Sequence, residues 1–195
     1  MNNLDWWTYR MEITTLLYSI IDRIGKQKIR SELTSDIESS RSYIEIIMAD
    51  CEKRIEAADE DALGSLCEGL LHFMLTVCSL PSIRKVEINN TVLDIVIPNI
   101  HTLKTFPNKS LVIQIAKKTN DMTLEKINTI TRFQPEYKNL WLLSKRPLSS
   151  GYINYTICPE EKVIPSFESR NFRDIIVDIQ NFLNETGDKS LRFFQ

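Results

Sequence analysis

Two short apolar runs, each carrying charge, constrain this chain more than any other feature. The run TVLDIVIP (91–98) places Asp94 among branched aliphatic residues, and the run SLVIQIAKK (110–118) ends on lysines that include Lys117. Short runs rich in Val and Ile, bounded by Asn, Pro and Ser, are typical of buried strands. Because an unpaired buried charge costs several kcal/mol, both charged residues are expected to be paired, to bind a metal or to border a site.

The segments around these runs alternate between helical and strand patterns. IRKVEI (83–88) is separated from the first run by Asn89-Asn90, a pair that favours a two-residue hairpin turn. The segment 61–80 is apolar nearly all round, which predicts a buried helix, and the short apolar run NLWLLS (139–144) predicts a strand in the middle of a sheet. This order predicts an α/β domain. The predicted elements are helix, three strands, helix, two strands and helix, at residues 61–80, 83–88, 91–98, 110–118, 121–134, 139–144, 151–158 and 171–184.

The first sixty residues carry a separate helical pattern. Apolar residues recur at helical spacing up to Gly25, and a second helix with a narrow apolar stripe is predicted over residues 34–58. Two such helices are expected to form an antiparallel hairpin that packs on the rest of the chain or on another subunit. The acidic run AADEDALG (57–64) marks a boundary. Residues 1–60 are therefore predicted to be a helical extension, and residues 61–195 the α/β domain.

Composition argues against several classes of protein. A hydrophobic content of 43% and a charged content of 26% are ordinary globular values. Apolar runs are shorter than the roughly 18 residues of a membrane span, and no signal-peptide pattern opens the chain, so a cytoplasmic protein without a membrane partner is expected. The four cysteines lack CxxC spacing, which favours reduced core thiols. Five glycines leave no Gly-rich phosphate loop.

Charge is divided unevenly along the chain. Residues 1–83 carry 8 Lys and Arg against 14 Asp and Glu, whereas residues 84–146 carry 11 against 5. The segment that holds both apolar runs therefore has a net charge of +6. A positive field of this kind is what a nucleic-acid backbone requires. The lysines expected to contact nucleic acid are Lys104, Lys109 and Lys118.

Polar residues of the first helix of the α/β domain fall on one stripe. They recur at steps of three and four, which places them on a single side of the helix. Glutamate is rarely buried without a partner, so Glu68 is either a satisfied residue at the rim of the core or part of a site. The stripe consists of Ser65, Glu68, His72, Thr76 and Ser79.

The order of these charged residues along the chain resembles that of the PD-(D/E)xK nuclease superfamily. It consists of an acid in the leading helix, an aspartate in the second strand and a lysine at the end of the third strand. This restriction-endonuclease-like fold includes archaeal Holliday-junction resolvases and RecB-type nucleases. The resemblance covers roughly residues 61–145. In that family the strand aspartate and a second carboxylate bind Mg²⁺, the lysine positions or activates the attacking water, and a helix glutamate often completes the site. By position, the resemblance implies that the catalytic residues are Asp94, Lys117 and Glu68.

The second carboxylate of that family is missing here. Ile115 stands two residues before Lys117, where the family carries Asp or Glu. Gln114 precedes it and points to the opposite sheet face in a regular strand, although a bulge would turn it toward the site. On this interpretation Mg²⁺ or Mn²⁺ is held by Asp94, Glu68 and Gln114.

Three hypotheses follow from these residues. In the first hypothesis, the chain is a nucleic-acid-binding protein of this fold that has lost catalysis and acts in DNA or RNA processing such as DNA repair. Alternatively, it is an active Mg²⁺-dependent nuclease with a modified site. In the third hypothesis it is a structural or protein-interaction domain in which Asp94 and Lys117 form a salt bridge between adjacent strands. The expected partner is DNA or RNA, and the N-terminal helices are expected, by analogy with nucleases that act in pairs, to form a homodimer interface.

Overall fold

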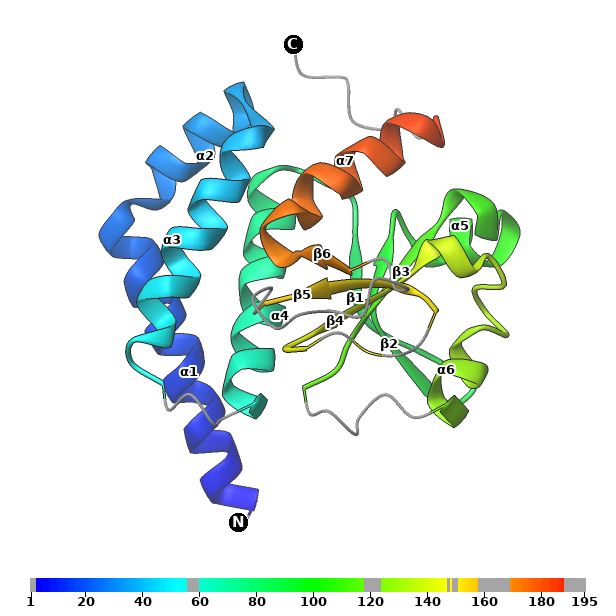
Figure 1. Ribbon diagram of the computed structural model, residues 1–195, viewed down its shortest axis with the longest axis horizontal. Coiled ribbons are helices and arrows are strands. Elements are labelled where there is room, and N and C mark those ends of the chain that lie inside the picture. The colour runs from blue at the N-terminus through cyan, green and yellow to red at the C-terminus, as the bar shows by residue number, and fades with distance from the viewer. Residues whose placement is uncertain are drawn as a thin grey trace.

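The computed structural model describes residues 3–55, 60–117, 124–146, 148, 151–157 and 169–187. Within these residues the chain forms seven α-helices and a six-stranded sheet (Figure 1). The helices are α1 (Asn3–Ile24), α2 (Lys26–Ser35), α3 (Ser40–Glu52), α4 (Glu60–Val77), α5 (Ile100–Thr105), α6 (Leu124–Ile130) and α7 (Ile175–Glu185). The strands are β1 (Ile83–Ile88), β2 (Thr91–Ile97), β3 (Leu111–Ile115), β4 (Leu140–Ser144), β5 (Ile153–Thr156) and β6 (Ser169–Asn171). Short 3₁₀ helices are η1 (Ile37–Ser39), η2 (Pro107–Lys109), η3 (Tyr137–Asn139) and η4 (Phe172–Asp174).

The sheet is mixed and follows chain order from β1 to β6. β1, β2 and β3 pair antiparallel, whereas β3, β4, β5 and β6 pair parallel. The predicted central strand is confirmed, because β4 lies between β3 and β5 and all five of its residues are buried. The predicted α/β class is likewise confirmed.

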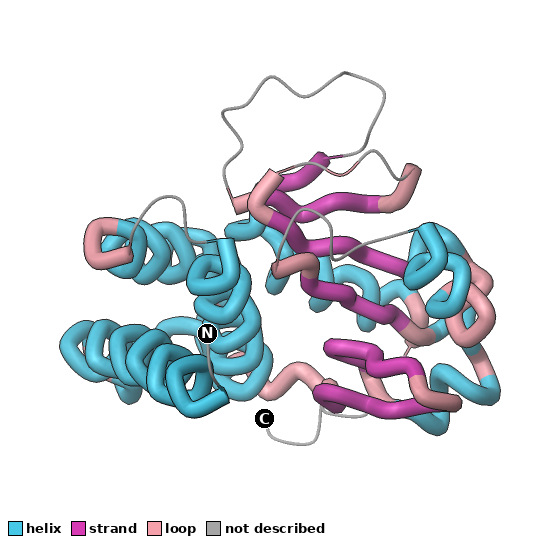
Figure 2. The backbone as a smooth tube through the Cα atoms, turned by 90° about the horizontal axis from the view of Figure 1, so that it is seen from below, coloured by secondary structure: helices cyan, strands magenta, loops and turns pink. Residues whose placement is uncertain are grey.

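Helices cover both faces of the sheet (Figure 2). Alternate residues of the central strands point to opposite faces, as the period of a strand requires. Ile95 and Ile113 join the larger core, which includes residues of α4 and α7. Val96 and Val112 join a second core with Leu103 of α5 and residues of α6. The sheet therefore lies between the α4 and α7 layer and the α5 and α6 layer.

The N-terminal helices differ from the prediction. The predicted start of a helix at residue 34 is wrong, because α2 already runs through this position and the chain turns at Asp36. The carboxylate of Asp36 accepts a hydrogen bond from the backbone nitrogen of Glu38 at 3.1 Å, and α3 begins two residues later. Gly25, predicted to stop the first helix, separates α1 from α2 with φ 103°. Gly25 tolerates this angle because it has no Cβ.

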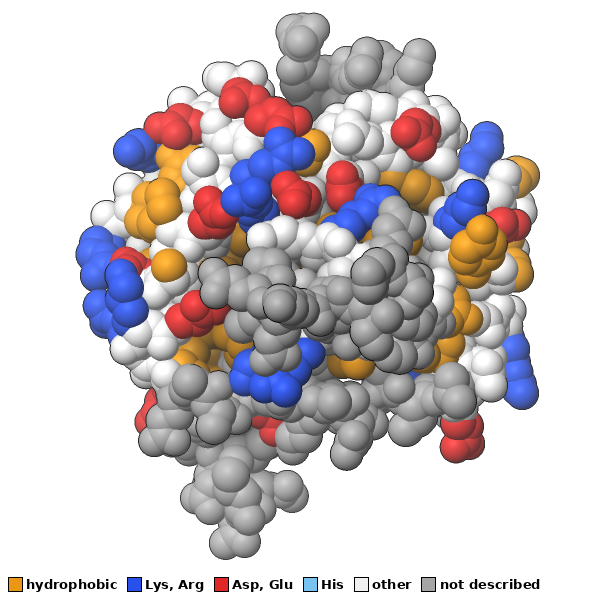
Figure 3. Space-filling model, in the orientation of Figure 1, with side chains coloured by type: hydrophobic (Ala, Val, Ile, Leu, Met, Phe, Trp, Pro, Cys, Tyr) orange, Lys and Arg blue, Asp and Glu red, His pale blue; other side chains and the backbone are white. Residues whose placement is uncertain are grey.

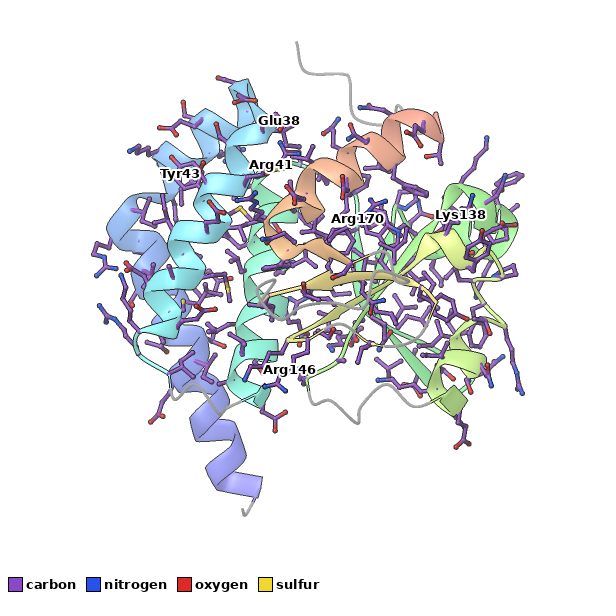
Figure 4. All side chains as sticks on the ribbon, in the orientation of Figure 1. Glu38, Arg41, Tyr43, Lys138, Arg146 and Arg170 are labelled. Atoms are coloured by element: carbon purple, nitrogen blue, oxygen red, sulfur yellow. The ribbon has the colours of Figure 1, made fainter. Side chains whose placement is uncertain are left out.

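Helices α1, α2 and α3 share the larger core with α4 and α7. Leu17 of α1 and Ile47 of α3 belong to the same buried cluster as Leu70 of α4. At the surface, Nε of Arg41 lies 2.6 Å from Oδ1 of Asp174, so α3 is also joined to the start of α7 (Figure 4). The division of the chain at residue 60 and a homodimer through these helices stay predictions.

Helix α5 and strand β6 are not among the predicted elements. The segment 99–109 lies between two predicted strands and contains α5, which is too short to show helical periodicity. Its start is determined locally, because Oδ1 of Asn99 accepts a hydrogen bond from the backbone nitrogen of Thr102 at 2.9 Å. β6 has three residues and gives no strand pattern. Among the residues described, no helix is both long and apolar enough to cross a membrane.

Candidate functional site

The β1–β2 hairpin determines which residues face each other in the first two strands. Asn89 and Asn90 have φ of 48° and 63°, which a two-residue type I′ turn requires, so the predicted turn is confirmed. The register that follows pairs Arg84 with Ile95 and Val86 with Leu93, so Lys85 and Asp94 fall between these two pairs. Nζ of Lys85 lies 2.5 Å from Oδ1 of Asp94. Lys85 itself has φ 50°, a left-handed conformation that a residue with a side chain rarely adopts inside a strand.

Asp94 lies where β2 and β3 separate. The ladder between these strands ends with Ile95 opposite Ile113. Beyond this pair, Oδ2 of Asp94 accepts a hydrogen bond from the backbone nitrogen of Ile115 at 2.8 Å. The backbone nitrogen of Asp94 in turn donates to Oε1 of Gln114 at 3.2 Å. Side chains thus replace the ladder at this point, and the Asp94 carboxylate is held between the two strands.

Glu68 of α4 joins both strands to the helix layer. Its Oε2 lies 2.8 Å from Nζ of Lys117, and its Oε1 lies 3.1 Å from Nζ of Lys85 and 3.2 Å from a guanidinium nitrogen of Arg84. The Glu68 side chain is only 3% exposed. We refer to Glu68, Arg84, Lys85, Asp94 and Lys117 as the charged centre.

Gly64 allows α4 to approach the end of β3. A Cβ at this position would lie 2.8 Å from Cα and 3.1 Å from Cβ of Lys117, closer than packed carbon atoms normally come. The backbone of Lys117 therefore occupies the space that a side chain on residue 64 would need. Glu68 lies one helical turn further along α4, so this contact brings Lys117 within reach of its carboxylate.

Within the charged centre, each residue whose pKa shifts is shifted toward its ionised form. Burial alone would raise the pKa of Glu68, but the ammonium groups of Lys117 and Lys85 outweigh it and lower the pKa to about 2. Burial likewise acts to lower the pKa of Lys85, but the carboxylates of Asp94 and Glu68 raise it. Three cations face two carboxylates, so each carboxylate is paired within the chain and the centre as a whole keeps a net positive charge.

The structure brings together three residues that the sequence singled out. Glu68, Asp94 and Lys117 belong to one chain of ion pairs, in which Lys85 connects the two carboxylates. The direct salt bridge expected between Asp94 and Lys117 is replaced by two pairs, Lys117 with Glu68 and Lys85 with Asp94. Lys85 and Arg84 were not predicted to belong to the site. The register of the Asn-Asn hairpin turn was the sequence signal that could have identified Lys85.

The residues of the centre do not fit a divalent cation as they stand. Mg²⁺ requires several free oxygen ligands, but each carboxylate already pairs with cations of the chain. Gln114 does not supply a replacement, because its Oε1 accepts from Asp94 and β3 pairs regularly with β4 through Ile115, without a bulge. Glu87, the carboxylate of β1, is exposed. Across the residues that the structure describes, no group of three or more His, Cys, Asp and Glu could hold a metal.

Two hollows border the charged centre. One, of about 200 Å³, lies against α1 and α4 and is lined in part by Glu68, His72 and Arg84. The other, of about 440 Å³, lies on the α6 side and is lined in part by Asp94 and Gln114. Burial and the nearby Arg84 guanidinium lower the pKa of His72, which therefore favours its neutral form. The charged centre is therefore bordered by space on both faces of the sheet.

Two of the predicted surface lysines are not members of this centre. Lys104 is exposed in the last turn of α5, and Lys109 is exposed at the end of η2. Both belong to the layer that covers the sheet face opposite α4. Lys118 lies outside the described residues.

Comparisons with known proteins give no identity. No family model, no curated protein and no solved structure matches this chain. Its function is therefore inferred from the chemistry of its own residues.

Proposed function

We propose that this chain is a nucleic-acid-binding protein with a restriction-endonuclease-like core that does not cut. The observation that carries the proposal is the position of Lys85. Its Nζ lies 2.5 Å from Oδ1 of Asp94 and 3.1 Å from Oε1 of Glu68, between the two carboxylates that the family resemblance assigns to a metal ion. An ammonium group neutralises both carboxylates, but it cannot act as a Lewis acid or generate a metal-bound hydroxide.

The arrangement of elements supports the resemblance on which this proposal draws. Helix α4 precedes the antiparallel strands β1, β2 and β3, and α6 then leads to β4, which is parallel to β3. The acid of the helix, the aspartate of the second strand and the lysine after the third strand contact one connected set of charges. These are the positions at which the nuclease superfamily carries its site residues.

Charge supports nucleic acid as the partner. The segment 84–146, which contains β1 to β4, carries 11 Lys and Arg against 5 Asp and Glu. Within the charged centre, cations exceed carboxylates, and the Lys85 side chain is 40% exposed. Cations that outnumber carboxylates on one part of a protein attract a polyphosphate and release its counterions on binding.

The proposal is tested by binding and cutting assays on the same labelled substrates. Single-stranded, duplex and branched oligonucleotides of DNA and RNA are titrated with protein in EDTA and with Mg²⁺ or Mn²⁺. We expect binding that weakens as salt concentration rises, because phosphate contacts release counterions, and we expect intact substrate on a denaturing gel under every condition. The charge reversal Lys104→Glu should weaken binding, whereas Lys28→Glu on α2, an exposed lysine in the acidic N-terminal segment, serves as the matched control.

Two outcomes would replace the proposal. Metal-dependent cutting that disappears in Asp94→Ala would identify an active nuclease with a modified site. Failure to bind any of these nucleic acids at low salt would instead favour a structural or protein-interaction domain.

A further inference from the structure

Two aromatic side chains are largely exposed to solvent and do not pack in either core. Phe106, between α5 and η2, is 52% exposed, and Tyr137, at the start of η3, is 58% exposed. Exposing so much of an aromatic ring to water forfeits the burial that most rings gain on folding. The position of the two rings on neighbouring segments therefore calls for a functional reason.

Two side-chain amides hold these two segments side by side. Nε2 of Gln134, which is fully buried, donates hydrogen bonds to the carbonyl oxygens of Pro107 at 3.0 Å and Ser110 at 2.7 Å. Nδ2 of Asn139 donates to the carbonyl oxygen of Asn108 at 3.1 Å. Because these bonds join loops that are far apart in the chain, the exposed rings sit on a fixed backbone. A ligand that contacts them need not first order the loops.

Lysine ammonium groups accompany both rings. Nζ of Lys109 lies 5.8 Å from the centre of the Phe106 ring, and Nζ of Lys138 lies 5.8 Å from the centre of the Tyr137 ring. Lys104, in the last turn of α5, is exposed two residues before Phe106. Figure 4 places Lys138 beside α5, and Figure 3 shows Lys and Arg side chains next to hydrophobic ones on this side of the molecule.

Charge on these segments is strongly one-sided. Residues 98–110 carry two lysines and no acid, and residues 132–139 carry Arg132 and Lys138 against the single acid Glu136. An anionic partner is therefore favoured over a neutral or cationic one. Alternating cations and exposed rings are the combination that binds unpaired bases and their phosphates together.

We propose that the surface formed by Lys104, Phe106, Lys109, Tyr137 and Lys138, the aromatic–lysine surface, binds single-stranded nucleic acid. The two rings stack on unpaired bases, and the ammonium groups contact the phosphates on either side. Bases in a duplex are already stacked on each other and do not reach the rings, so the surface prefers single strands. This inference rests on the proposed function and specifies where, and in which form, the nucleic acid binds.

The inference is tested by fluorescence anisotropy with labelled oligonucleotides. The probes are a dT oligonucleotide, the matching rU oligonucleotide and a duplex of the same length, each measured over a series of salt concentrations. In the full-length protein we expect Phe106→Ala and Tyr137→Ala each to weaken single-strand binding about tenfold, because each removes a ring on which a base stacks. For the single strands, we expect Lys109→Ala and Lys138→Ala to lower the slope of log affinity against log salt concentration by about 0.7 each. The dT and rU probes report whether the sugar matters.

Matched variants separate stacking from other effects. Tyr137→Phe keeps the ring and should bind as the unchanged protein does, whereas loss of binding in Tyr137→Phe would indicate a hydrogen bond from the hydroxyl and overturn stacking. Ile46→Ala removes an exposed apolar side chain from α3, away from this surface, and should have no effect. A thermal melt of each variant checks that the fold is retained.

Different results would overturn the aromatic–lysine surface and the proposed function. If the protein binds single strands and the double variant Phe106→Ala/Tyr137→Ala binds them equally well, the aromatic–lysine surface is wrong and nucleic-acid binding stands. Duplex binding as tight as single-strand binding, unaffected by either ring, would also overturn the surface. If no probe binds at low salt, both proposals fall, and an acidic protein partner becomes the candidate for this surface.

Discussion

Lys85 and Asp94 face each other across the β1–β2 hairpin, and Nζ of Lys85 lies 2.5 Å from Oδ1 of Asp94. The same ammonium group reaches Oε1 of Glu68 at 3.1 Å, so a side chain of the edge strand β1 connects β2 to α4. The charged centre is thereby part of the fold as well as a candidate site. Its members are expected to respond to mutation and to pH in ways that unfolding experiments can measure.

The first prediction concerns the backbone of Lys85. Lys85→Gly and Lys85→Ala remove the same ammonium group, but only alanine retains a Cβ at φ 50°. Because glycine adopts positive φ without a steric cost, Lys85→Gly should be more stable than Lys85→Ala by about 0.5–1 kcal/mol. Urea unfolding of both variants measures the difference.

A neighbouring position supplies the control for that pair. Glu87 lies in the same strand and is exposed, but it does not have a positive φ. The order should reverse there, with Glu87→Ala more stable than Glu87→Gly. If Lys85→Ala equals or exceeds Lys85→Gly in stability, the left-handed conformation at residue 85 does not carry the cost assigned to it.

The second prediction is a pH dependence that belongs to Glu68. The pKa of its carboxyl falls from an ordinary value of 4.5 to about 2 on folding. Since the folded pKa is lowered, the stabilisation is fully present above about pH 5 and is lost as pH falls through 4.5 toward 2. The free energy of unfolding should therefore decline over this range by an amount on the order of 3 kcal/mol from this group.

Comparison with Glu68→Gln isolates that contribution. Both proteins carry the same other carboxylates, so the difference between their unfolding free energies should shrink as pH falls below 4.5. Glu87→Gln, at an exposed carboxyl, should show no such convergence. Parallel curves for the unchanged protein and Glu68→Gln down to pH 2 would contradict the assigned ion pairs.

The third prediction compares two glycines of α4. Alanine favours a helix over glycine by about 1 kcal/mol, but a Cβ at residue 64 would lie 2.8 Å from the backbone of Lys117. Gly64→Ala should therefore destabilise the fold by about 1–3 kcal/mol, as expected for overpacking. At Gly69 the new Cβ would meet only the end of the Leu17 side chain, which can rotate away. Gly69→Ala should be neutral or more stable, and equal effects of the two substitutions in urea unfolding would refute the close approach of α4.

Short-range rules explain which parts of the sheet could be predicted. The Asn89-Asn90 turn and the flanking apolar runs determine β1 and β2, and the fully apolar NLWLLS lies in the interior of the sheet as expected. The same turn also brings Lys85 to Asp94, a contact that the apolar pattern of the strands does not indicate.

The elements and contacts that the sequence did not predict depend on local capping and on long-range packing. The break at Asp36 and the short helix α5 depend on single side chains that accept backbone hydrogen bonds, and such contacts leave no periodic pattern. The polar stripe of α4 identified Glu68 as unusual but not its partners. Those partners come from β1 and from the end of β3, and they meet Glu68 only when the sheet packs on α4 through the gap at Gly64.

We propose that Lys85 closes the charged centre to divalent metal. Titration of Mn²⁺ followed by electron paramagnetic resonance tests it directly, with the unchanged protein, Lys85→Ala and Lys85→Ala/Asp94→Asn side by side. We expect no Mn²⁺ binding that depends on Asp94 in the unchanged protein, a gain of binding in Lys85→Ala, and loss of that gain in the double variant. Stoichiometric Mn²⁺ binding by the unchanged protein that disappears in Asp94→Asn would contradict it.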